Sequence, residues 1–373
     1  MRPEQLEIRA LQALRNKEIV DAIGMLRRLT QLKTSDARAH FLLGYALDEY
    51  ATRSDSTPDR QESLRNLAIE SLEEAIRLQP EYADAHRVLG YVLLNQGLLE
   101  PSIYHSNRAI QLDPGDASAY VNIGSARALQ KKHEMARQAF QQAIRLDPRS
   151  DEAHYLLALV LLDLNEIDTA LHHLRQCAQI NPDHVRAQYR LGYVYFHRDD
   201  LTSALSHLEN AMSIKPDYIP AYVLMASLHL RQENWTEVRK HARAAIRLGA
   251  SADRYPSVHY NLGIALYKMQ EYAESVRYLE ASKQSYPDDP QISFFLGNAY
   301  YALAEYAAAR EAYESALGLQ PDNADLLYNA GNACFMLHDI ACVFERYHRS
   351  CDMGLNLACD RIEALNETER NKP

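Results

Sequence analysis

The chain has 373 residues, of which 47% are hydrophobic and 24% charged, and this composition argues against disorder over most of its length. Forty basic and fifty acidic residues give a formal net charge of −10. This sign excludes the usual nucleic-acid-binding protein, which presents a basic face, and thirteen Gly and fourteen Pro are few for an all-β chain with many tight turns.

Prolines recur along the chain with a period of 34 residues. They are Pro80, Pro114, Pro148, Pro182 and Pro216, followed in the same spacing by Pro287 and Pro321. Within one period, apolar residues recur every three to four positions over 121–129, and a second amphipathic run covers 135–146. Because proline disfavours helix just before it, each period is predicted to hold two helices of about thirteen residues and a proline stop.

In chain order, the period predicts ten helix-pair units. Their predicted bounds are 3–36, 37–82, 83–116, 117–150, 151–184, 185–218, 219–255, 256–289, 290–323 and 324–355. The second unit carries an insertion, residues 51–62, which we expect to form a polar loop between its helices. The seventh lacks its proline and ends at 248–251, where we expect a kink or a hinge. Residues 356–373 are predicted to form a capping helix, over 357–365, and a polar tail from Asn366 to Pro373.

The eighth position of every unit is small. The residues are Ala10, Gly44, Gly90, Gly124, Ala158, Gly192, Ala226, Gly263, Gly297 and Gly331. Two helices that cross at small side chains pack closely, and a large residue there would force them apart. The position is therefore predicted to be the crossing point of each helix pair.

A 34-residue helix–turn–helix with small residues at fixed places and a terminal proline resembles the tetratricopeptide repeat. The resemblance covers residues 3–355, nearly the whole chain. It implies an all-α fold: a right-handed superhelical solenoid of about ten repeats over residues 1–355, closed by the capping helix.

By the same resemblance, positions 2, 5, 9, 12 and 13 of each unit line a concave groove, and here they are rich in aromatic residues. The candidate partner-binding residues are Tyr155, Arg186, Tyr189, Tyr193, Phe196, Tyr260, Tyr267, Phe294, Asn298, Tyr301, Tyr328 and Asn332. Tyrosine offers a large rigid surface with a hydroxyl, and asparagine can pair with a peptide backbone. The alternative is that these aromatic rings fill gaps between adjacent first helices.

Two functions follow from this pattern. The first is a non-catalytic scaffold or adaptor that holds a partner peptide or helix in the aromatic groove. The second is a structural subunit of a larger assembly, such as motility, pilus or secretion machinery, or a self-assembling solenoid. The oligomeric state stays open. No run approaches the roughly 20 apolar residues of a membrane span, and no apolar segment follows the N-terminus, so we expect a cytoplasmic protein without direct membrane insertion.

The fifteen histidines invite a metal or catalytic hypothesis. His40, His86, His154 and His259 share position 4 of their units, and His105, His173, His207 and His241 share position 23. This regularity predicts a repeated half-buried niche. We expect no metal and no cofactor, because ligands must converge. We also expect no enzyme activity, because the chain has no phosphate loop, nucleophile elbow or His-Glu-x-x-His motif.

Four of the five cysteines lie close together, at Cys334, Cys342, Cys351 and Cys359. Residues 349–359 are similar to the junction of Sel1-like repeats, and this resemblance implies a bridge between neighbouring helices. The alternative is buried reduced thiols, since cysteine packs as a small apolar residue. We expect the thiols; bridges would instead indicate an oxidising compartment.

Overall fold

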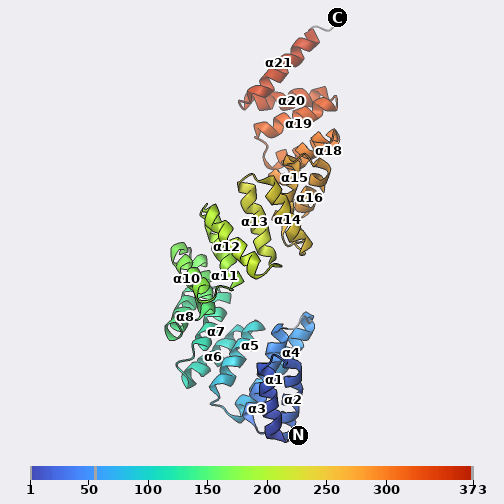
Figure 1. Ribbon diagram of the computed structural model, residues 1–373. Coiled ribbons are helices and arrows are strands. Elements are labelled where there is room, and N and C mark those ends of the chain that lie inside the picture. Colours follow the sequence, from blue (N-terminus) through green and yellow to red (C-terminus); the bar gives the residue numbers. More distant parts are fainter. Residues whose placement is uncertain (1, 54–56, 371–373) are drawn as a thin grey trace. The chain divides into compact units, whose positions relative to one another are not determined.

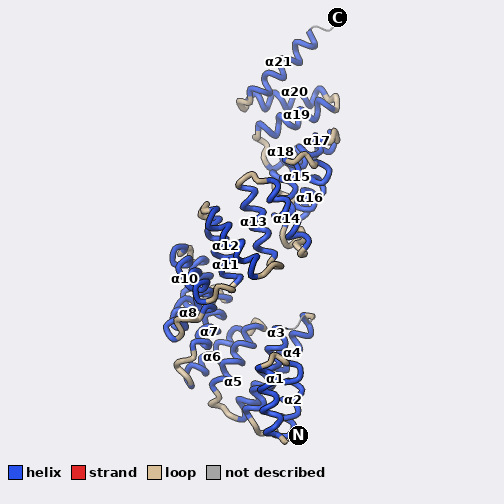
Figure 2. The backbone as a smooth tube through the Cα atoms, in the orientation of Figure 1, coloured by secondary structure: helices blue, strands red, loops and turns tan. Residues whose placement is uncertain are grey.

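The computed structural model describes residues 2–53 and 57–370, and every regular element in this part of the chain is a helix (Figures 1 and 2). The first ten helices are α1 (Pro3–Arg15), α2 (Ile19–Leu32), α3 (Ala37–Arg53), α4 (Pro58–Leu78), α5 (Ala83–Asn95), α6 (Leu99–Leu112), α7 (Ala117–Leu129), α8 (His133–Leu146), α9 (Asp151–Asp163) and α10 (Ile167–Ile180). The others are α11 (Val185–His197), α12 (Leu201–Ile214), α13 (Ile219–Arg231), α14 (Trp235–Arg247), α15 (Pro256–Lys268), α16 (Tyr272–Ser285), α17 (Pro290–Ala302), α18 (Tyr306–Leu319), α19 (Ala324–Met336), α20 (Ile340–Asp352) and α21 (Asn356–Arg370).

The helices group into two compact units, residues 1–187 and 188–373. Within each unit a helix packs against the helix before it and the helix after it, as α7 does with α6 and α8, and α19 with α18 and α20. Each unit is thus a stack of helix hairpins, the arrangement of an all-α solenoid. Among the described residues, no helix combines the length and the apolar character that a bilayer crossing requires.

Each predicted repeat encloses two successive helices, but two details differ from prediction. Most of the insertion at 51–62 is helical, because α3 runs on to Arg53 and α4 begins at Pro58; of the expected loop, residues 54–56 lie outside the described part. The expected polar tail is also partly helical, since α21 continues to Arg370. Polar insertions can lengthen helices because Arg, Glu and Gln are good helix formers.

The joint after α14 has a defined cap. Gly249 adopts a φ of 101°, and the amide of Ala250 donates to the carbonyl of Ala245 at 2.9 Å. This pattern is the Schellman motif, which ends a helix at a left-handed glycine. Ala250 is buried beside Ala245, as this motif commonly requires of the residue after the glycine.

Close approach at position 8 is confirmed by the structure. A Cβ atom added to Gly124 would lie 2.6 Å from the Phe140 ring, and one added to Gly331 would lie 2.5 Å from the Tyr347 ring. At Gly192 the nearest atom is Cγ of Leu208, at 2.8 Å. These distances are shorter than van der Waals contact, so in these three repeats the second helix packs directly on the glycine backbone.

In the repeats whose turn the structure describes completely, the turn contains a left-handed residue. Lys131, Asn165, Ala304 and His338 have φ values near 60°, and Gly97 has a φ of 75° at the same place. Three residues separate the two helices at each of these turns, so one left-handed residue is enough to reverse the chain.

Neighbouring repeats are joined by side-chain hydrogen bonds of similar sequence span. Asn122 Nδ2 donates to the carbonyl of Arg87 at 3.1 Å, across 35 residues. Asn261 Nδ2 donates to Ser227 Oγ at 2.9 Å, across 34 residues. Each bond therefore joins a first helix to the first helix of the preceding repeat.

The cysteines correct the expectation of reduced thiols. Cys334 is bonded to Cys342, which joins α19 to α20, and Cys351 is bonded to Cys359, which joins α20 to α21. The Cα–Cα distances are 5.9 and 5.0 Å, within the range that a disulfide allows. Cys177 is a buried free thiol. The bridge implied by the Sel1-like resemblance, Cys351 to Cys359, is present, and together with the first bridge it joins α19, α20 and α21.

Candidate functional site

The predicted groove residues differ in how much surface they offer. Arg186 and Tyr193 are exposed. Eight others are half-buried: Tyr189, Tyr260, Tyr267, Phe294, Asn298, Tyr301, Tyr328 and Asn332. Most of these rings contact another ring, as Tyr189 does with Tyr218 at 5.6 Å and Tyr267 with Phe295 at 5.8 Å. Part of each aromatic surface is thus used to pack adjacent helices, as the alternative reading expects.

Tyr155 and Phe196 correct the prediction, because both are buried. Tyr155 is 4% exposed, under the guanidinium of Arg186 and beside the His184 ring at 4.8 Å. Phe196 is 7% exposed, and the Arg231 guanidinium lies 3.9 Å from its ring centroid. Both rings serve as packing surfaces for arginine and have little area left for a partner.

The two asparagines of the predicted site are hydrogen-bonded within their own repeats. Tyr313 donates to Asn298 Oδ1 at 2.8 Å, and Tyr347 donates to Asn332 Oδ1 at 2.7 Å. These are the tyrosines whose rings cover the glycine crossings, so each asparagine also orients the ring beside it. Burial raises the pKa of Tyr347 to about 12, so its hydroxyl stays protonated and remains a donor.

One cavity brings predicted residues together, at the C-terminal repeats. We call it the C-terminal pocket. It measures about 320 Å³ and is lined by Tyr301, Asn332, Phe335, Met336, Tyr347, Arg361, Ala364 and Leu365. Phe335 and Met336 are 44% and 38% exposed, so two large apolar side chains at the pocket are accessible to a ligand. The pocket therefore offers apolar surface, a tyrosine hydroxyl and one cationic group.

Arg361 supplies the charge of the C-terminal pocket. A hydrogen bond to Tyr328 holds the pKa of the Arg361 guanidinium above its usual value. Residues 361, 364 and 365 lie on one face of α21, and the bond from Cys359 to Cys351 ties that helix to α20. Sequence reasoning missed Arg361 because α21 lies outside the repeat register; the apolar stripe of Ala364 and Leu365 beside it was the available signal.

A second cavity, of about 430 Å³, lies between the first repeats, and we call it the N-terminal pocket. It is lined by Leu11, Leu14, Arg15, Lys17, Ile19, Phe41, Leu42, Tyr45, Glu49, Arg53 and Arg87. Four of these side chains are cationic and one is anionic, and Glu49 is paired with Arg53 at 2.5 Å. None of them belongs to the predicted site, because the prediction favoured the aromatic residues of the fifth to tenth repeats.

The repeated histidine niche is confirmed. Nδ1 of His86 lies 3.0 Å from Nδ1 of His105, and Nδ1 of His154 lies 2.9 Å from Nδ1 of His173. His86 Nε2 also contacts the carbonyl oxygen of Pro80 at 3.1 Å and must donate to it, so its Nδ1 accepts from His105. Burial lowers the pKa of both His105 and His173 to about 4, so these pairs are neutral at pH 7.

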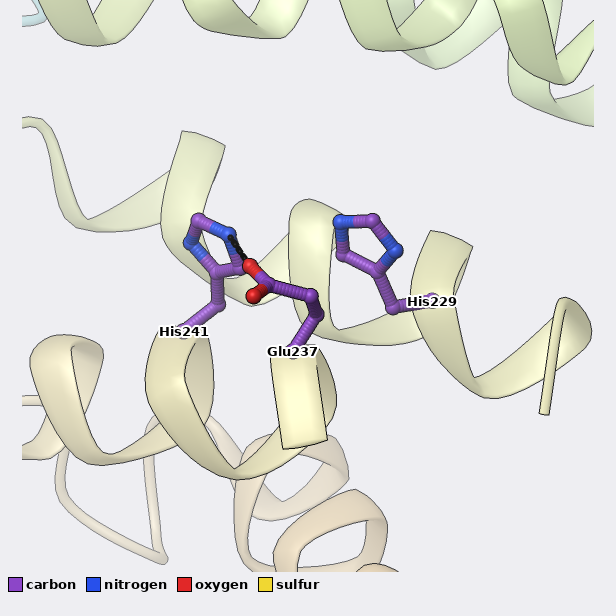
Figure 3. Close-up of side chains that lie close together, drawn as sticks. All are labelled: His229, Glu237 and His241. Atoms are coloured by element: carbon purple, nitrogen blue, oxygen red, sulfur yellow. Dashed lines mark ion pairs between the residues drawn. The ribbon is translucent and has the colours of Figure 1, made fainter. Parts of the chain in front are cut away.

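A different histidine cluster lies in the seventh repeat (Figure 3). His229 comes from α13, and Glu237 and His241 come from α14; one ligand atom of each lies within 4.8 Å of the others. His241 Nε2 is 3.4 Å from Glu237 Oε2. Sequence analysis predicted no metal site and missed this group, although Glu237 and His241 stand one helical turn apart. Their meeting with His229 depends on how the two helices pack.

Profiles of known families match most of the repeat region. Profiles described as "Tetratricopeptide repeat" and "TPR repeat" match residues 155–219 and 223–290, and 66–97 and 297–337, respectively. A profile described as "Anaphase-promoting complex, cyclosome, subunit 3" matches residues 95–177. A comparison with curated proteins finds no match.

Solved structures share the fold. The APC/C hetero-tetramer Cut9–Hcn1 matches with a TM-score of 0.51 and 13% identity, over 89% of this chain and 76% of that chain. MamA from Desulfovibrio magneticus RS-1 matches with a TM-score of 0.41 and 19% identity, over 49% and 96%. YrrB, described as a TPR protein with an unusual peptide-binding site, matches with a TM-score of 0.39 and 18% identity, over 56% of this chain and 97% of that chain.

Proposed function

Since the chain belongs to the tetratricopeptide-repeat family, whose members are protein-interaction scaffolds, we propose that it is a non-catalytic scaffold that binds a partner peptide or helix at the C-terminal pocket. The observation that carries this proposal is the convergence of Tyr301 and Asn332, both predicted from sequence, with exposed Phe335 and Met336 and with Arg361. The other predicted aromatics that keep exposed area, from Tyr189 to Tyr328 and without the buried Phe196, extend the proposed surface along the first helices.

The lining of the C-terminal pocket indicates which side chains a bound partner segment should carry. Phe335 and Met336 suit an apolar anchor, because phenylalanine offers a large rigid apolar surface and the flexible methionine adapts to irregular shapes. Arg361 suits a carboxylate next to that anchor, since guanidinium binds carboxylate through paired donors. We therefore propose an apolar and acidic segment as the ligand, and no nucleic acid.

The compartment follows from the cysteines. The cytoplasmic expectation came from the lack of an apolar segment after the N-terminus and required reduced thiols, and the two bridges do not meet that requirement. Disulfides persist in oxidising compartments and are rare in the cytosol. We propose that the protein works in an oxidising compartment. Alkylation of the denatured, unreduced protein should then modify Cys177 alone; modification of five cysteines would restore the cytoplasmic assignment.

A peptide-display selection on the intact full chain tests the binding proposal. We expect enriched sequences that pair a large apolar residue with Asp or Glu, and a loss of at least tenfold in affinity for Phe335→Ser and for Arg361→Glu. Leu357→Ser is the matched control, because Leu357 is an exposed apolar residue of the same helix α21 and does not line the pocket.

The same experiment distinguishes peptide binding at the C-terminal pocket from the alternative function, a structural subunit of a larger assembly. If the selected peptides bind Phe335→Ser and Arg361→Glu as tightly as the wild type, the pocket is not the binding site. Cross-linking in native extract would then favour the assembly-subunit alternative if the links fall only on second helices or chain ends.

A further inference from the structure

The geometry points to a zinc-binding site in the seventh repeat, formed by His229, Glu237 and His241 (Figure 3). The donor set is two imidazole nitrogens and one carboxylate oxygen, which zinc accepts together with a water molecule. The inference is independent of the proposed partner binding, because none of the three residues lines the C-terminal pocket.

The three side chains are placed by one helix hairpin. Glu237 and His241 lie four residues apart on α14, so their side chains project from the same face. His229 lies in the last turn of α13, and its ring stacks on that of His241 with centroids 5.5 Å apart and an angle of 13°. Asn234 caps α14 by accepting the amide of Glu237, which fixes the start of that helix.

The distances are close to what a zinc ion needs. The three ligand atoms lie within 4.8 Å of one another. Tetrahedral bonds of the usual length would place them roughly 3.4 Å apart. A closure of about 1 Å by rotation of side chains, chiefly that of the partly exposed Glu237, would complete the site.

The ring of His229 is oriented as in metal sites. Its Nδ1 lies 3.0 Å from Gln232 Oε1, an atom that only accepts, so Nδ1 carries the proton. Nε2 therefore has a free lone pair, and Figure 3 shows this side of the ring turned toward Glu237. Metal-bound histidines almost always donate their second nitrogen to an oxygen in this way.

His241 is available because its repeat lacks the usual histidine partner. In the third and fifth repeats, the position-23 histidines are hydrogen-bonded to His86 and His154. In the seventh repeat the corresponding residue is Tyr222, whose hydroxyl donates to the carbonyl of Pro216. His241 instead directs Nε2 to Glu237, and its Nδ1 is buried without a hydrogen-bond partner in the part of the chain that the structure describes.

A metal ion at this cluster would compete with the neighbouring Lys240 for the Glu237 carboxylate. Lys240 Nζ lies 2.7 Å from Glu237 Oε2 and lowers the pKa of that carboxyl, so the carboxylate is ionised but paired. The Lys240 side chain is 65% exposed and returns to water at little cost when a divalent ion replaces it. Burial lowers the pKa of His241 to about 4, which leaves a neutral ligand at pH 7.

Titration of the EDTA-treated, unreduced full chain tests the site. With the bridges intact, Cys334, Cys342, Cys351 and Cys359 supply no thiolates. We expect one zinc ion per chain by calorimetry, a higher melting temperature with zinc, and the visible absorption of tetrahedral Co²⁺ when cobalt is used as the probe. His229→Gln and Glu237→Gln should each weaken zinc binding at least tenfold.

Two matched variants sharpen the test. His173→Gln changes the same repeat position in the fifth unit and should leave zinc affinity unchanged. Lys240→Ala frees the carboxylate and should tighten binding severalfold. Melting of each metal-free variant shows that the fold is retained. If Glu237→Gln binds zinc as tightly as the wild type, or if His173→Gln loses as much affinity as His229→Gln, the inference is wrong.

Discussion

The two compact units fill equivalent places of the repeat with different side chains. In residues 1–187, positions 4 and 23 are twice occupied by hydrogen-bonded histidine pairs, such as His154 with His173. In residues 188–373 the same niche holds Gln188 with His207, and Tyr222 with His241. The repeat fixes where two side chains meet, and the residue types decide whether the contact is a neutral pair or leaves a ligand atom available.

The pockets of the two units differ in a related way. The N-terminal pocket has several cations and no covalent link across its walls. The C-terminal pocket has one cation, Arg361, and lies among helices that two disulfides tie together. The first unit thus combines several charges with apolar side chains in a pocket held by packing, whereas the pocket of the second unit carries one cation and lies among disulfide-linked helices.

The largest expected effect concerns what the two units share. Gly44→Leu in the first unit and Gly192→Leu in the second should each destabilise by about 3 kcal/mol through overpacking. The reason is that Cγ of Leu72 or Leu208 lies within 2.8 Å of the added Cβ. Urea unfolding, monitored through the hydrogen exchange of each unit, measures the change in stability. Gly318→Leu is the control, since a Cβ there meets nothing within 4 Å; an equal loss in the control would contradict the crossing geometry.

The next largest effect, loss of the bond between Cys351 and Cys359, should destabilise only the second unit. Replacing Cys351 and Cys359 by serine should cost about 2–3 kcal/mol, because a short covalent loop no longer restricts the unfolded chain. Hydrogen exchange should accelerate in α20 and α21 and stay unchanged from α1 to α8. A uniform acceleration along the chain would show that the bridge does not act locally.

Lowering the pH should have a smaller effect on the stability of the two units. The folded pKa of His105 and of His173 is about 4, and the unfolded value is about 6.5. Their contribution to stability is therefore complete above pH 6.5 and is lost as pH falls from 6.5 to 4. We expect about 1 kcal/mol per pH unit from the two together, after allowance for solvent screening.

The variant His105→Gln with His173→Gln measures this contribution. It should flatten the acid dependence of the first unit, followed as urea midpoints between pH 4.5 and 7.5. The second unit should keep its own dependence, because the pKa of His241 is also about 4. An unchanged slope in the first unit would mean that these imidazoles do not titrate as their burial requires.

The smallest effect concerns the left-handed turns. Ala304→Gly should stabilise by about 0.5–1 kcal/mol, because its φ of 62° suits glycine better than alanine. Gly97→Ala, at the same place in the first unit, should cost a similar amount. Ala302→Gly, at the last helical residue of α17, is the matched control and should destabilise, because its helical backbone favours alanine. Thermal melting separates the three variants, and the same sign for Ala304→Gly and Ala302→Gly would exclude this account.

Sequence periodicity was enough to predict the helix hairpins and the glycine crossings, because both depend on spacing along the chain. Periodicity did not predict how deeply each groove side chain is buried. Tyr155 and Phe196 lie at groove positions, yet arginines from neighbouring helices cover them. Arg361 was missed because α21 does not follow the repeat register, and the His229 cluster because its members meet only across the packed hairpin.

The hydrogen bonds between repeats have a consequence for synthesis. Asn122 and Asn261 reach back only 35 and 34 residues. When a repeat leaves the ribosome, its partners in the preceding repeat have already emerged, so the hairpins can be added in the order of translation. The four bridged cysteines, from residue 334 to residue 359, follow the first nine repeats. Oxidation therefore acts after the preceding repeats have emerged, and it links helices that contribute to the C-terminal pocket.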